Sequence, residues 1–196
     1  MRRHVMTCAI AILALGTLAI PTTAQAKDGH DHGHSRRVRL LDNCDPATFN
    51  AAFGDGICVP HGNKPTTPLP EFLAKLNPAD GGHPLWANKP TELEIEANDS
   101  IKVVVRGGEF HTFTEVPFTE GLQAGCFAGI NVALELTNPP TQAQCDEFFA
   151  TTGVVAYCGS TLTVSGLSEG SHLFMCEIHP WMRTVVTVEG DHEDDD

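Results

Sequence analysis

Short stretches in which apolar residues recur at every second position occupy the chain from about residue 93 onward, and they limit the folds open to it. Leu93 and Ile95 alternate with glutamates, and Ile101, Val103 and Val105 follow after a turn signal. Such period-two patterns are typical of half-buried strands. The same reasoning predicts further strands at 110–116, 161–164, 172–176 and 184–188. No long helical pattern interrupts them, so the sequence predicts an all-β chain folded as an antiparallel sandwich.

One segment near the C-terminus carries metal chemistry. Cys176, His179 and Met182 stand at Cys-x2-His-x2-Met spacing, at the end of one expected strand and before the next. Thiolate and thioether sulfur suit Cu(I), and imidazole nitrogen suits both oxidation states of copper. Two histidines and one cysteine with a weak axial methionine form the blue-copper electron-transfer site. The spacing therefore predicts three of four copper ligands, and the second histidine must come from elsewhere.

His111 is the best candidate for that second histidine. It follows two glycines, which allow a bend or bulge that re-aims a side chain, and it lies in the expected strand at 110–116. His83 sits in a Gly-Gly turn and is expected to face solvent, whereas His172 lies too far along the strand of Cys176 and is expected on the surface. Met182 has a rival interpretation as a plain core methionine. The predicted copper ligands are His111, Cys176, His179 and Met182.

The spacing disfavours other metal sites. A binuclear copper centre needs a second cysteine in the loop, where residue 172 is histidine. A multicopper oxidase needs paired His-x-His motifs across several domains, and zinc is disfavoured because methionine is a poor zinc ligand. The only His-x-His series here is His30, His32 and His34, near the N-terminus. With neighbouring aspartates it either binds Cu(II) or zinc weakly or is a hydrophilic tail, and both interpretations stay open.

Taken together, the strand pattern, the upstream histidine and the Cys-x2-His-x2-Met loop resemble the cupredoxins. The short loop with Pro180 after its histidine is similar to that of amicyanin, and GGEFHTFTEV at 107–116 resembles a group of bacterial cupredoxin-domain proteins. Over about residues 83–190 the resemblance implies a Greek-key β-sandwich that holds one type 1 copper ion, preceded by a loop-rich N-terminal extension. By position, the four predicted ligands match those of the family.

Two features depart from the family pattern. Amicyanin-like proteins have an asparagine after the first histidine ligand, and its side chain ties the two ligand loops together. Here Thr112 stands in that place, so the tie is weaker or is made by the hydroxyl group. The segment 121–160 is also long for a minimal cupredoxin and is expected to cover part of the copper end.

The chain is expected to have five parts. Two arginines, an apolar stretch up to Ile20 and an Ala-Gln-Ala ending at Ala26 predict a signal peptide over 1–26. Its apolar stretch is short for a membrane span, which needs about 20 residues. The remaining parts are a disordered His-rich lead at 27–41, an extension with cysteines and prolines at 42–82, the cupredoxin domain at 83–190 and an acidic tail at 191–196. Short helices are expected at 71–76 and 142–150.

Cysteine use agrees with export, because exported chains keep disulfides. If Cys176 binds metal, five cysteines remain after the signal peptide, so at most two disulfides form. Cys44 and Cys58 make the easiest pair, because both lie in the loop-rich extension. The sequence does not choose among Cys126, Cys145 and Cys158.

Charge narrows the possible partners. Twelve lysines and arginines face 25 aspartates and glutamates, a net charge of −13 that argues against nucleic acid binding. The sequence predicts a periplasmic or secreted monomer without a membrane span after signal removal. It would carry single electrons to and from a redox protein such as a basic cytochrome, with His179 as the electron port inside an apolar rim of Phe174, Pro180 and Trp181. A periplasmic copper carrier or storage protein is the alternative, and an enzyme is not expected, since no substrate pocket or acid–base pair is evident.

Overall fold

The computed structural model describes residues 33–62, 65–76, 81–119, 121–151, 154–155 and 159–190. The predicted signal peptide, residues 27–32 of the His-rich lead, Cys158 and the acidic tail lie outside these residues. Within them, no helix combines the length and the apolar character that crossing a membrane requires.

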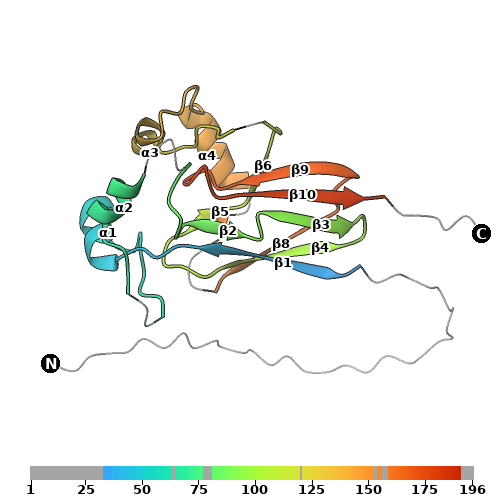
Figure 1. Ribbon diagram of the computed structural model, residues 1–196, viewed down its shortest axis with the longest axis horizontal. Coiled ribbons are helices and arrows are strands. Elements are labelled where there is room, and N and C mark those ends of the chain that lie inside the picture. The colour runs from blue at the N-terminus through green and yellow to red at the C-terminus, as the bar shows by residue number, and fades with distance from the viewer. Residues whose placement is uncertain are drawn as a thin grey trace, which may run out of the picture. The chain divides into compact units, whose positions relative to one another are not determined.

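Among the described residues, two four-stranded sheets form the framework, and their arrangement can be followed in Figure 1. The first sheet has the order β2-β1-β4-β8, from Ala87–Lys89, Ser35–Leu41, Ser100–Val105 and Thr161–Ser165. The second has the order β3-β10-β9-β6, from Glu92–Glu96, Arg183–Glu189, Gly170–Met175 and Thr114–Val116. A two-stranded sheet pairs β5 (His111–Thr112) with β7 (Val154–Val155). Apolar side chains from both large sheets share one core, among them Val103 and Val186, and the predicted sandwich is confirmed.

The strand pairing is mixed, whereas the sequence analysis expected antiparallel sheets. β1 runs parallel to β4, and β3 runs parallel to β10. Local alternation shows which face of a strand is buried but not which strand lies beside it, so the parallel pairs could not be read from the pattern. The expected strand at 110–116 is divided at Phe113, whose buried ring stacks on Phe174 with centroids 4.5 Å apart.

The expectation of a disordered lead over 27–41 is wrong for its second half. Ser35–Leu41 forms β1, an inner strand of the first sheet. Val38 and Leu40 are fully buried, and the alternating arginines beside them point outward. The period-two signal is present here, but it contains too few apolar residues to stand out among the charges.

The helices of the described residues lie toward one end of the strands, where the loop from β9 to β10 also lies (Figure 1). They are α1 (Pro46–Phe53), α2 (Leu69–Lys75), α3 (Ala128–Ala133) and α4 (Gln142–Thr151). α2 and α4 confirm the two predicted helices within a few residues. α1 was not predicted, although Asp45 and Pro46 are typical of a helix start, and the Asp45 carboxylate accepts a hydrogen bond of 3.0 Å from Thr48 N–H.

Two disulfides fasten the helical end. Cys44 is bonded to Cys58, as predicted, and Cys126 is bonded to Cys145, which settles a choice that the sequence left open. The second disulfide ties α4 to the chain that precedes α3. Cys176 is a free, buried cysteine.

Candidate metal centre

Three predicted ligands converge on one buried point. The ligand atoms of His111, Cys176 and His179 all lie within 4.8 Å of one another. Each histidine turns its Nδ1 toward the sulfur of Cys176, at 3.8 Å in both cases. His111 and Cys176 are fully buried, and His179 is 2% exposed. The structure thus brings together residues that are up to 68 positions apart in the sequence.

The loop between β9 and β10 positions two of these residues and the predicted axial methionine. Cys176 follows directly after β9, and its N–H donates to the carbonyl of Met182 at 3.0 Å. The N–H of Met182 donates in turn to the carbonyl of His179 at 2.8 Å. These bonds close a tight turn, and the Met182 side chain is fully buried.

Thr112 ties the two ligand-bearing segments together. Its hydroxyl oxygen accepts a hydrogen bond of 2.8 Å from Glu177 N–H, and its own N–H lies 3.5 Å from the sulfur of Cys176. The tie that the sequence analysis questioned is therefore made by the threonine hydroxyl. A hydrogen bond to the sulfur also withdraws electron density from it, which is one way in which a protein tunes a bound metal.

The charges of the metal-free site support a thiolate. Burial opposes ionisation of Cys176, but the imidazoles of His111 and His179 outweigh it and hold the pKa of the thiol well below its usual range. Burial likewise opposes a charged His111, yet the carboxylate of Asp42 and the sulfur of Cys176 raise its pKa to about 10. The pocket therefore favours a negative sulfur, the form that binds metal.

Asp42 was not predicted, and it completes the site from the N-terminal extension. Its carboxylate lies 2.8 Å from His111 Nε2, and both side chains are fully buried. It also accepts hydrogen bonds from Gly108 N–H at 2.8 Å and Glu109 N–H at 3.3 Å. Burial alone would raise the pKa of Asp42, but the hydrogen bond and the charge of His111, together with the bond from Gly108 N–H, lower it. A carboxylate on the outer nitrogen fixes the tautomer in which Nδ1 is free for a metal.

Glu109 stands in a similar place beside His179. Its carboxylate accepts a hydrogen bond from the indole N–H of Trp86 and lies 3.7 Å from His179 Nε2. Burial raises the pKa of Glu109. Both ligand histidines therefore have a buried carboxyl group behind them, and neither group leaves a local sequence signal, because each acts over a long sequence separation.

The prediction that His179 forms an exposed port is wrong. The rings of Trp181 and Phe72 cover it, with centroids 5.4 and 6.4 Å from its own. Phe72 belongs to α2 of the extension, whose packing the sequence analysis could not foresee. The predicted rim is wrong for Phe174, which lies in the core, and for Pro180, which is buried. It holds for Trp181, which is half-buried and lies beside His179.

The two other candidate histidines lie away from the cluster. His172 is partly exposed and lies 2.6 Å from a carboxylate oxygen of Glu115. His83, expected to face solvent, is 1% exposed instead, because its ring stacks on Phe72 and meets the edge of Trp86. Burial lowers the pKa of His83 to about 4.

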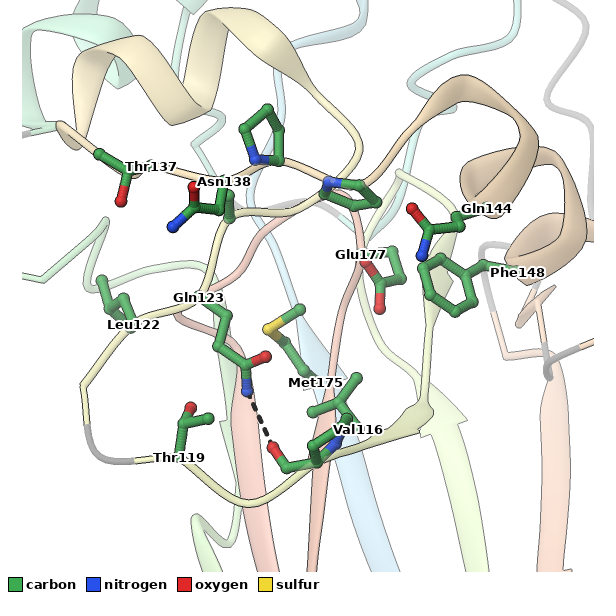
Figure 2. A pocket seen from close by; sticks show the side chains of 14 residues that line it. Val116, Thr119, Leu122, Gln123, Thr137, Asn138, Gln144, Phe148, Met175 and Glu177 are labelled. Atoms are coloured by element: carbon green, nitrogen blue, oxygen red, sulfur yellow. Dashed lines mark hydrogen bonds between the residues drawn. The ribbon is translucent and has the colours of Figure 1, made fainter.

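The segment 121–160 lies against the ligand loop, as expected. Cys126 N–H donates to the carbonyl of Glu177 at 2.7 Å, and a Cβ added to Gly125 would meet the same carbonyl oxygen at 2.4 Å. Glu177 itself turns its carboxyl group into a polar cleft between this segment and β9 (Figure 2). Burial, with the neighbouring sulfur, raises the pKa of Glu177 to about 7.

Comparisons with known proteins give a likeness of fold. No family model and no curated protein matches the chain. Among solved structures, a purple cupredoxin from Nitrosopumilus maritimus is 11% identical over 79% of this chain and 99% of that one, with a TM-score of 0.40. A mutant fern plastocyanin is 13% identical over 58% and 94%, with a TM-score of 0.33. A Cu(I) amicyanin mutant is 17% identical over 53% and 73%, with a TM-score of 0.31.

Proposed function

We propose that the protein binds one copper ion through His111, Cys176, His179 and Met182 and carries single electrons. The observation that supports this most directly is the convergence of two imidazole Nδ1 atoms on one buried thiol sulfur. Two nitrogens and one thiolate in a trigonal set, with a thioether on the same loop, are the donors of a type 1 copper site.

The donor set fits copper better than zinc. Structural zinc sites use four strong nitrogen, sulfur or carboxylate ligands. Among the described residues, this cluster offers three such atoms, and the fourth predicted ligand, Met182, is a methionine. Bound copper would supply one-electron chemistry through a thiolate bond.

The residues of the chain would hold the ligands still. Thr112 joins the two ligand segments, Asp42 fixes the ring of His111, and the disulfide from Cys44 to Cys58 anchors the chain around Asp42. A ligand set that moves little between oxidation states keeps the reorganisation on electron transfer small. Burial of the three ligand groups also favours retention of the ion, which supports an electron carrier over a copper carrier.

Trp181 is the proposed route for electrons. Its half-buried ring approaches His179, at 5.4 Å between centroids, and reaches the surface. Its indole N–H donates to the carbonyl of Trp86 at 2.8 Å, which fixes the ring against the site. We further propose that the chain is exported and meets a basic redox partner, in keeping with its net charge of −13.

The visible spectrum tests this proposal. The purified chain with one equivalent of Cu(II) should show a strong band near ~600 nm, the sign of thiolate-to-copper charge transfer. The Cys176→Ala variant should lose the band, whereas the surface variant His172→Ala should keep it. A faint band in the unmodified chain, or an unchanged band in Cys176→Ala, would rule out the four-ligand site. Loss of copper to an acceptor chelator during redox cycling would instead favour the carrier role.

A further inference from the structure

An apolar pocket of about 550 Å³ opens beside His179. Its walls come from α1 and α2 of the extension and from the chain around α3, including Phe49, Ile57 and Ile130. Three large apolar side chains of this pocket are exposed: Phe53 at 55%, Leu73 at 50% and Phe127 at 41%. Exposed apolar groups gathered in one place mark binding sites more often than chance. The volume lies within the range of pockets that take small organic molecules.

Two polar residues contribute to this lining, Glu109 and His179. The carboxyl group of Glu109 is held by the indole N–H of Trp86, so its position is set by the fold. A small number of placed polar groups in an otherwise apolar pocket fixes the orientation of a ligand. Phe49, Phe72 and Phe110 also line the space, and aromatic walls favour a flat ring.

The charge of the surroundings narrows the ligand class further. A net charge of −13 and a carboxyl group in the lining disfavour an anionic ligand. A hydroxyl group suits Glu109, because it donates to a carboxylate and accepts from a carboxylic acid. Pairing with a hydroxyl therefore does not depend on the protonation of Glu109.

We propose that this pocket binds a neutral aromatic molecule that carries a hydroxyl group, of the phenol class, with the ring among the phenylalanines and the hydroxyl on Glu109. The site goes beyond the proposed electron transfer, and it exists with or without bound metal. It places a small organic molecule directly against the histidine that we assign to copper.

Gly129 offers a way to fill the pocket. It lines the space, lies within α3, and has no atom within 4 Å of the position where a Cβ would sit. Because Gly129 lines the pocket and an added Cβ meets no atom, Gly129→Phe should add a ring at the pocket wall without a backbone clash, and Gly129→Leu adds a smaller side chain. Val132 is on the same helix, is 78% exposed and does not line the pocket, so Val132→Phe is the matched control.

The test is a calorimetric titration of the full chain with 2-naphthol, in the metal-free form and after loading with Cu(I), which avoids oxidation of the probe. We expect saturable one-site binding in both forms, weakened at least tenfold by Gly129→Phe and changed less than twofold by Val132→Phe. Naphthalene, which lacks the hydroxyl, should bind about three- to tenfold more weakly, the effect of one hydrogen bond. Circular dichroism and thermal melting check that the variants fold.

Two outcomes would overturn the proposal. One is the absence of saturable 2-naphthol binding up to its solubility limit, which would instead favour a protein partner for the exposed apolar residues at the pocket mouth. The other is equal affinity in folded Gly129→Phe or Gly129→Leu and in the unmodified chain. Because the metal-free chain is titrated too, failure here leaves the copper proposal intact. A missing band near ~600 nm would likewise leave this proposal intact.

Discussion

Replacing Asp42 by asparagine tests how far the N-terminal extension belongs to the metal centre. The substitution keeps the volume of the side chain and removes its charge. Asp42 accepts hydrogen bonds from Gly108 N–H and Glu109 N–H and lies 2.8 Å from His111 Nε2. An asparagine has one acceptor oxygen and one NH₂ group. Its oxygen can still accept from Gly108 N–H. Its NH₂ group would face Glu109 N–H and His111 Nε2–H, which are donors too, so these two groups would lose their acceptor.

The structure gives the size of two effects of this substitution, one on the free energy of unfolding and one on the reduction potential of the copper form. Two buried donors lose their acceptor, and each unpaired group costs about 1–3 kcal/mol, so the free energy of unfolding should fall by about 2–6 kcal/mol. Asp42 would lie roughly 7 Å from a metal on Nδ1, allowing for the ring and a metal–nitrogen bond. At an effective dielectric constant near 20 its charge contributes about 2 kcal/mol. Removing it disfavours Cu(II) and should raise the reduction potential by tens of millivolts, up to about 100 mV.

Urea unfolding of the metal-free chain and voltammetry of the copper form measure these two effects separately. Asp99→Asn is the matched control. Asp99 is also a buried carboxylate that accepts from backbone N–H groups, those of His34 and Glu96. It belongs to the turn from β3 to β4, and this turn lies at the end of the strands away from the helices (Figure 1). Asp99→Asn should lower stability and leave the potential unchanged. Equal potentials in Asp42→Asn and the unmodified chain would refute the role given to Asp42.

Three further predictions follow from the geometry. Thr112→Val removes the acceptor of Glu177 N–H and should lower the free energy of unfolding by about 1–3 kcal/mol, measured by urea unfolding. Thr112→Ser keeps the hydroxyl and should be close to the unmodified chain. Equal losses of stability in both variants would contradict the role of the hydroxyl. The double variant Cys44→Ala/Cys58→Ala opens a disulfide of sequence separation 14 and should lose about 3 kcal/mol, seen as a lower melting temperature, whereas an unchanged melting temperature would count against the bond. His83 has a pKa of about 4 when folded and about 6.5 when unfolded, so its contribution to stability is complete above pH 6.5 and is lost as the pH falls toward 4. Between pH 6.5 and pH 4, the melting temperature of His83→Phe should therefore fall less than that of the unmodified chain. If the two melting temperatures fall equally with pH, a buried neutral imidazole beside Lys75 and Glu71 is ruled out.

The sequence predicts the parts of this molecule that have a local signal. The alternation around Ile101 predicts a strand, and the spacing of Cys176, His179 and Met182 predicts a ligand loop, because both depend on residues close together in the chain. Asp42 acts on His111 across 69 positions, and no local pattern marks such a pair. The burial of His179 depends on where α2 packs, which is a property of the tertiary structure alone.

The sequence also failed to predict strand β1 and the burial of His83, each for a different reason. β1 was hidden because its few apolar residues, Val38, Leu40 and Leu41, stand beside a run of charged residues. His83 seemed exposed because it follows two glycines, yet the aromatic rings of Phe72 and Trp86 enclose it. Glycine-rich turns are usually on the surface, whereas Phe72 of the extension packs against this one.

The spacing of the cysteines has a consequence for the order in which the protein matures. The two disulfides join residues only 14 and 19 positions apart, whereas the contacts that assemble the metal site span 65 and 69 positions. Short loops close with less loss of entropy than long ones and form sooner on the folding pathway. The four cystine sulfurs should therefore be consumed by oxidation before the sheets come together. Closed disulfides leave fewer free thiols that could pair with Cys176 by oxidation, so the timing of folding favours its arrival in the core as a free thiol.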